Sequence, residues 1–155
     1  MNAVWPPAMR GVVVRSATQV ALALRAAQAL GRAEALPLLS PPGAARWLGP
    51  RLFLAMVAEG ARQAAAGGRL PGPLPVLDCR TAPGLALAAL RAGLPVVVLE
   101  PDCPAFAAVE AVAGTLNAAV WPSPPPALDL GPGRAETART HLRLARWLGA
   151  EEAGG

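Results

Sequence analysis

Two segments of the sequence place an arginine and a hydroxyl residue directly after a run of apolar residues. In the first, Val12-Val13-Val14 is followed by Arg15-Ser16 and then by Thr18. In the second, Val76-Leu77-Asp78-Cys79 is followed by Arg80-Thr81. An alanine-rich helical segment comes next in both. Guanidinium groups and the free N–H groups of a helix N-terminus both bind anions, so the repeated pattern predicts an anion site where each strand meets its helix.

Further polar residues follow other predicted strands. Because the carboxyl ends of parallel strands meet at one edge of a sheet, we expect all of these side chains at that edge. The predicted ligand-binding residues are Arg15, Ser16, Thr18, Ser40, Arg80, Thr81 and Asp102. In the alternative interpretation, Ser16, Thr18 and Thr81 only cap helices and the arginines are solvated.

Asp78 and Cys79 are the residues of the second segment that could react. Asp78 could act as a general base, and a Cys79 thiolate could be activated by Arg80 and the following helix N-terminus. Asp78 beside the thiol opposes that activation. A phosphatase-like cysteine loop needs an arginine six positions on, where this chain has Leu85. We therefore keep Asp78 and Cys79 as catalytic candidates for an alternative, enzymatic function.

Several familiar motifs are missing. The turn after the first strand holds no glycine, so it lacks the dinucleotide fingerprint, and the chain has no lysine for a P-loop. His141 is the single histidine, so neither a Ser-His-Asp set nor a metal site can be assembled. The sequence identifies no cofactor.

Composition favours one folded domain. The chain has 155 residues, of which 54% are hydrophobic and 15% charged, enough to bury a core. Its net charge of +4 comes from arginines spread along the chain with few aromatic residues, so specific nucleic-acid binding is not expected. The longest apolar stretch is interrupted by Arg91 and two prolines, and no membrane span is expected. Two cysteines without a signal peptide indicate the cytoplasm.

Apolar runs and helical segments alternate about five times, which predicts an α/β fold. We expect a three-layer α/β/α arrangement with a mostly parallel five-stranded sheet, in flavodoxin-like order 2-1-3-4-5 or, second, a Rossmann-like order. The predicted strands are Gly11–Arg15, Leu36–Ser40, Pro75–Cys79, Pro95–Leu99 and Ala118–Trp121. Pro37 restricts the second to an edge or short strand.

The predicted helices begin after these strands, and one of them is interrupted. They are Ala17–Leu30, Ala44–Ala66 with a break at Gly49-Pro50, Pro83–Ala92, Pro104–Ala113 and Arg134–Leu148. Residues 1–9 are an irregular lead-in, 10–122 a single domain, 123–133 a proline-rich linker, 134–149 a helix packed on the same domain, and 150–155 a frayed tail.

The segment Val76–Gly93, VLDCRTAPGLALAALRAG, resembles a segment of short uncharacterised bacterial proteins. The resemblance covers only this segment and implies a compact bacterial α/β domain. It implies no activity.

Three functions remain open on the sequence. The first is a cytoplasmic module that binds a small anionic ligand or a protein partner at the carboxyl edge of the sheet. The second is an enzyme that acts on a small anionic substrate through Asp78 or Cys79. The third is a self-associating accessory protein, a homo-oligomer with contacts through the apolar helix Pro83–Ala92 and through Trp47 and Trp147, which both lie in an Ala-Arg-Trp-Leu-Gly segment.

Overall fold

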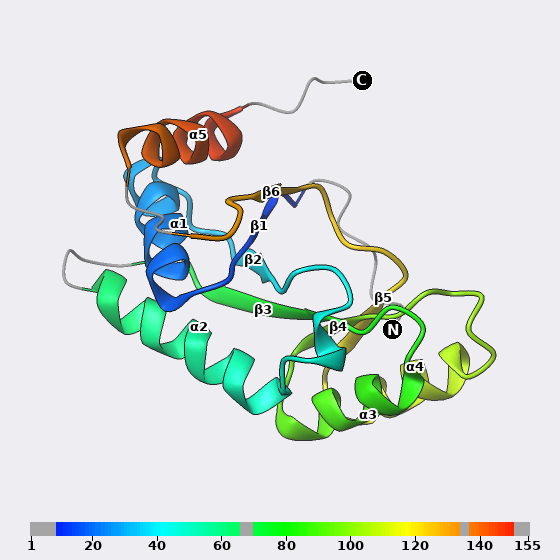
Figure 1. Cartoon of the computed structure of the whole chain (residues 1–155). Helices are drawn as coiled ribbons and strands as arrows, with labels where there is room; N and C mark the ends of the chain where they lie inside the picture. The colour runs from blue at the N-terminus through cyan, green and yellow to red at the C-terminus, as the bar shows by residue number, and fades with distance from the viewer. Residues whose placement is uncertain (1–8, 66–69, 134–136, 151–155) are drawn as a thin grey trace.

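The computed structural model describes residues 9–65, 70–133 and 137–150. They form an α/β fold around a parallel sheet of six strands, in the order β5-β4-β3-β2-β1-β6 (Figure 1). The strands are β1 (Gly11–Val13), β2 (Leu36–Leu39), β3 (Pro73–Asp78), β4 (Val96–Val98), β5 (Ala119–Trp121) and β6 (Ala127–Asp129). The helices are α1 (Ala17–Ala29), the short 3-10 helix η1 (Ala44–Arg46), α2 (Pro50–Ala64), α3 (Pro83–Ala92), α4 (Phe106–Thr115) and α5 (Ala138–Gly149).

The strand order corrects both predicted orders. From β1 to β5 each strand lies beside the previous one, so the order never reverses as it does in flavodoxin-like and Rossmann-like sheets. Right-handed crossovers that all step in one direction place their helices on the same face of the sheet. Strand order depends on which strands pair with each other across the sheet. The local runs of apolar residues predict where strands form but do not indicate how they pair.

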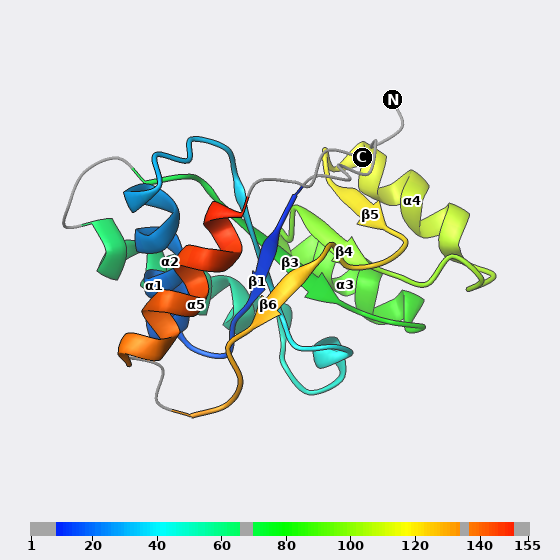
Figure 2. The same ribbon diagram turned by 90° about the horizontal axis from the view of Figure 1, so that it is seen from above.

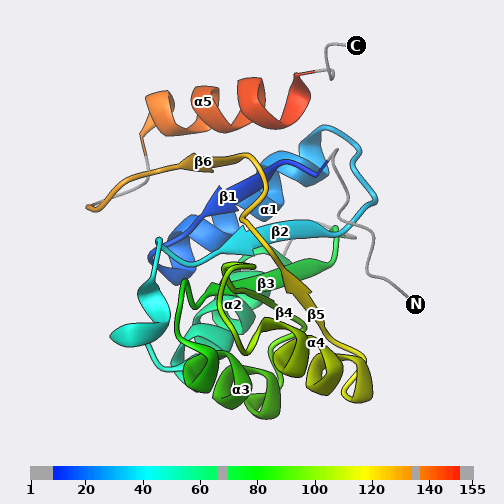
Figure 3. The same ribbon diagram turned by 90° about the vertical axis from the view of Figure 1, so that its right-hand side faces the viewer.

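The two faces of the sheet have different cover. Strand residues such as Val12, Leu38 and Leu77 share one apolar cluster with the buried residues of α1, α2, α3, α4 and α5. The alternate residues Val13, Leu39, Val76, Val96, Val98 and Trp121 form a second cluster that contains no residue of a described helix. The described helices therefore cover one face, where we expected helices on both (Figure 3).

The sixth strand lies in the segment predicted to be a linker, so the sheet has six strands and not five. β6 pairs in parallel with β1, with Gly11 opposite Ala127 and Val13 opposite Asp129. Five residues, 122–126, connect β5 to β6, which lie at opposite ends of the strand order. Figure 2 shows the two strands joined by this short connection. So few residues can join them because the sheet twists strongly. The prolines that precede β6 lie in the connection at 122–126, and β6 itself contains none, so they remove no N–H group from the strand.

β2 is short, as Pro37 predicts, but it lies inside the sheet between β1 and β3. Its ladder with β1 begins at Leu38, so Pro37 lies outside that ladder and its missing N–H removes no bond to β1. Helix boundaries agree more closely with the sequence. Ser16 caps α1, Gly49-Pro50 separates η1 from α2, and Gly93 ends α3 in the left-handed conformation.

Candidate functional site

At the carboxyl edge of the sheet, Ser40 and Asp78 form a buried hydrogen-bonded pair. The backbone N–H of Asp78 donates to Ser40 Oγ at 3.0 Å, and Ser40 Oγ donates to the carbonyl of Pro41 at 3.2 Å. The Asp78 carboxylate accepts the backbone N–H of Arg80 at 3.0 Å. This bond helps to hold Arg80 at φ 45°, in the left-handed region that residues other than glycine rarely adopt. Ser40 and Asp78 thus stabilise the turn after β3.

Cys79 lies in the helix-covered core and its side chain is fully buried. Burial, and to a smaller extent the charge of the neighbouring Asp78 carboxylate, together raise the pKa of its thiol to about 12. Such a thiol is protonated at neutral pH, and it has no access to solvent from which a substrate would approach. The thiolate chemistry considered for Cys79 therefore finds no support in its surroundings.

Arg15 forms an ion pair with Asp129, a residue that the sequence did not indicate as a partner. Its guanidinium forms a two-armed ion pair with Asp129 at the end of β6, and the second arm measures 3.0 Å from Nη2 to Oδ2. Hydrogen bonding to Arg15 lowers the pKa of Asp129, and the same hydrogen bond raises the pKa of Arg15. Asp129 was missed because it lies in the segment interpreted as a linker.

The remaining carboxyl-edge residues are dispersed rather than gathered. Ser16 Oγ accepts the N–H of Gln19 at 3.2 Å as a helix cap, and Thr18 is exposed on α1. Thr81 Oγ1 accepts a hydrogen bond from Arg46 at 3.4 Å, and Asp102 is exposed in the turn after β4.

Arg15 and Arg80 do not converge on one point. Arg80 follows β3 and its side chain lies beside Gly43, whereas Arg15 follows β1, and β2 lies between those strands. The structure therefore brings Ser40, Asp78 and Arg80 together, and it separates them from Arg15.

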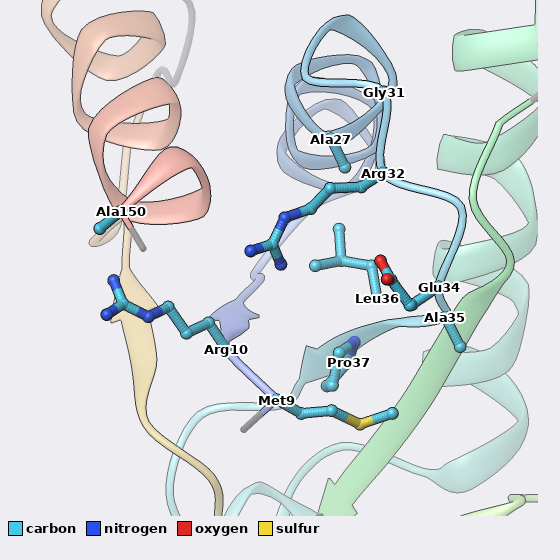
Figure 4. A pocket seen from close by; sticks show the side chains of 10 residues that line it. All are labelled: Met9, Arg10, Ala27, Gly31, Arg32, Glu34, Ala35, Leu36, Pro37 and Ala150. Carbon is cyan, nitrogen blue, oxygen red and sulfur yellow. The ribbon is translucent and has the colours of Figure 1, made fainter. Parts of the chain in front are cut away.

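A cavity of about 410 Å³ lies at the opposite, amino edge of the sheet (Figure 4). Three polar side chains line it: Arg10 before β1, and Arg32 and Glu34 between α1 and β2. The rest of its wall is mostly apolar and comes from Met9, Ala27, Gly31, Ala35, Leu36, Pro37 and Ala150. No local pattern in the sequence indicates this cavity, because its polar residues come from two separate segments, before β1 and between α1 and β2.

The end of α1 fixes the direction of Arg32. Gly31 adopts φ 68° and donates its N–H to the carbonyl of Gln28, and the N–H of Arg32 donates to Ala27 O at 3.1 Å. This pair of bonds is the Schellman ending of a helix. Figure 4 shows the Arg32 guanidinium extending from that turn into the space between Arg10 and Glu34. Within the described residues, the half-buried Arg32 side chain has no hydrogen-bond or ion-pair partner.

Arg10 is held in place by the end of α5. Its guanidinium lies 4.8 Å from the ring centroid of Trp147, and Nη1 donates to the carbonyl of Trp147 at 3.0 Å. Trp147 Nε1 in turn donates to the carbonyl of Gly11 at 2.8 Å. These contacts orient Arg10 at the wall of the cavity, and they leave other N–H groups of its guanidinium for a ligand.

Neither a metal centre nor a membrane span emerges from the described part of the chain. No group of three or more His, Cys, Asp or Glu residues there could hold a metal ion. No helix in the same residues is long and apolar enough to cross a membrane.

Comparison of the chain with known proteins gives no family assignment: no family model matches it, and neither does any curated protein.

Proposed function

We propose that this protein is a small binding module, without catalysis of its own, whose ligand carries an anionic group and enters the amino-edge cavity. The observation that carries the proposal is the Arg32 guanidinium, which lines the cavity and has no partner within the described residues. An arginine in that situation favours a carboxylate or phosphate that completes its hydrogen bonds.

The size and lining of the cavity support a small ligand. A volume of about 410 Å³ is within the range of small-molecule sites. Leu36 and Pro37 are buried and Met9 is half-buried, so the floor offers apolar contact for a short alkyl group. Arg10, held by Trp147, adds positive charge on the α5 side.

The ligand site at the carboxyl edge remains a competing proposal. It is supported by Arg80, which is exposed, and by Arg46 beside Thr81. It is weakened because Asp129 neutralises Arg15. The enzymatic alternative is weakened by the surroundings of Cys79 and by the hydrogen bonds that engage Asp78.

A calorimetric titration with pentanoate distinguishes the two edges. We expect pentanoate to bind the wild-type protein, and Arg32→Gln to weaken that binding about tenfold or more, since a charged hydrogen-bonded contact is lost. Arg80→Gln and the exposed control Arg139→Gln should leave the affinity unchanged. Loss of binding in Arg80→Gln with no change in Arg32→Gln would contradict the amino-edge site and favour the carboxyl edge.

Self-association is a second candidate function, favoured by two large exposed apolar side chains. Trp47 is 68% exposed and Leu52 is 64% exposed at the beginning of α2. Trp147, by contrast, is engaged within the chain through Gly11 and Arg10. Sedimentation velocity should show a concentration-dependent dimer that Trp47→Ala removes. A strict monomer at high concentration would reject this function.

A further inference from the structure

We propose that the ligand of the amino-edge cavity carries an ammonium group as well as an anionic one, as an α-amino acid does. This inference rests on the proposed function, because it names the chemical class of the ligand in the same cavity. It comes from the charges around the cavity, which are of both signs.

Glu34 supplies the negative side of the cavity. It lies two residues after Arg32 in the turn between α1 and β2, and its carboxylate lines the same cavity (Figure 4). Arg32 and Glu34 do not form an ion pair with each other, and within the described residues neither has another ionic partner. In the described part of the chain, the cavity thus has one unpaired positive group, Arg32, and one unpaired negative group, Glu34. A ligand that carries one negative and one positive group is complementary to them.

Two helix ends strengthen the preference for a cationic group. α1 ends at Ala29 and α5 at Gly149, and residues just beyond both ends, Gly31 and Ala150, line the cavity. The C-terminal end of a helix carries a partial negative charge, so two such ends disfavour a ligand that is only anionic. Arg10 already offsets the end of α5 by donating to the carbonyl of Trp147.

The position of both charges in one turn suits a ligand with a small polar head. Arg32 and Glu34 are two residues apart and line the same cavity, so adjacent groups of one ligand can reach both. The apolar wall formed by Leu36, Pro37 and Met9 then receives the side chain. An α-amino acid with a short alkyl side chain has a carboxylate for Arg32, an adjacent ammonium group for Glu34 and an alkyl group for the apolar wall.

The test compares three probes that share one carbon chain: norvaline, pentanoate and pentylamine. Norvaline carries both charged groups, and the other two carry one each. We expect calorimetry to give norvaline an affinity about tenfold higher than pentanoate, since it adds one charged hydrogen-bonded contact. Pentylamine should bind more weakly than norvaline.

Glu34→Gln tests the role of the carboxylate. The variant should bind pentanoate as the wild type does and should lose most of the preference for norvaline. Glu110→Gln, an exposed carboxylate on α4, is the matched control and should keep the full preference. Because Glu34 is exposed in a turn, circular dichroism should show both variants folded like the wild type.

The outcomes separate the two proposals. If pentanoate binds and norvaline binds no more tightly, the ligand class inferred here is overturned while the anion site stands. A norvaline preference that persists in Glu34→Gln also overturns the inference, because the ammonium group is then recognised elsewhere. If neither pentanoate nor norvaline binds, both the inference and the proposed function fail.

Discussion

Arg15 and Asp129 form a two-armed ion pair that connects the beginning of α1 to the end of β6. Asp129 also accepts the N–H of Gly131 at 2.7 Å, and Arg143 of α5 donates to its backbone carbonyl at 3.2 Å. Gln19 of α1 donates to Gly131 O at 2.9 Å. The edge strand β6 and the connection toward α5 are therefore held against α1 by a small polar network around one carboxylate.

Asp129→Asn should lower the free energy of unfolding by about 0.5–1 kcal/mol at pH 7, since both partners are partly exposed. Asparagine retains an oxygen for the Gly131 N–H. The folded state lowers the pKa of Asp129, so its contribution is present above the ordinary Asp pKa of about 3.9 and is lost as the pH falls through the folded value. Urea unfolding of both proteins should therefore differ at pH 7 and converge near pH 2. A difference that stays constant with pH would contradict an ionic contribution.

Gly60→Ala should destabilise the protein because α1 and α2 touch at this glycine. A Cβ at position 60 would lie 2.3 Å from Val20 Cβ and 2.6 Å from the carbonyl of Ala17. We expect a loss of about 1–3 kcal/mol in the free energy of unfolding, measured with urea. Gly114→Ala in α4 is the matched control, because its Cβ meets nothing within 4 Å and should stabilise that helix slightly. Equal effects of the two substitutions would contradict the close helix contact.

The stability of the protein should fall at alkaline pH mainly through Cys79. Its folded pKa of about 12 exceeds the ordinary thiol value of about 8.5, so its contribution is complete below the ordinary value and is lost as the pH rises through the folded one. The chain has no lysine and no tyrosine, so few other groups titrate in this window. Cys79→Ala should flatten the decline measured by urea unfolding between pH 9 and 11.

Cys103→Ala is the control for that experiment, since Cys103 is only half-buried. It should leave the alkaline decline intact. A decline that is identical in wild type and Cys79→Ala would show that the thiol ionises as readily in the folded protein as in the unfolded chain.

Trp147→Phe should cost about 1–2 kcal/mol of stability, because it removes the hydrogen bond to the carbonyl of Gly11 and weakens the contact with Arg10. Trp47→Phe is a matched control in the same Ala-Arg-Trp-Leu-Gly sequence, and its exposed side chain should contribute almost nothing to the stability of the monomer. Thermal unfolding of the two variants compares them directly. Similar melting temperatures would contradict the role assigned to Trp147.

Local features of the fold were predictable because they depend on neighbouring residues. Ser16 caps α1, Pro50 opens α2 and Gly93 ends α3, as their residue types indicate. β6 was not predictable, because three residues among prolines give too short a pattern and their partner, β1, is distant in the sequence. The order in which β1 to β5 follow one another across the sheet was not predictable either, because it also depends on pairing between distant segments.

The surroundings of individual side chains likewise depend on contacts between residues that are distant in the sequence. In β3 and just beyond it, Leu77 and Cys79 both belong to the helix-covered core, whereas Val76 belongs to the cluster on the other face. The alternation of side chains along a strand was a signal that Cys79 points into a core. Nothing local indicated that Asp129 would neutralise Arg15, or that Arg32, after the glycine that ends α1, would line a cavity.

The most direct test of the binding function is two-dimensional NMR of the wild-type protein during a norvaline titration. Binding in the amino-edge cavity predicts saturable shifts of the amide signals of Arg32, Glu34 and Leu36, with those of Arg80 and Thr81 unchanged. Shifts confined to Arg80 and Thr81, or no shifts at saturating norvaline, would contradict it.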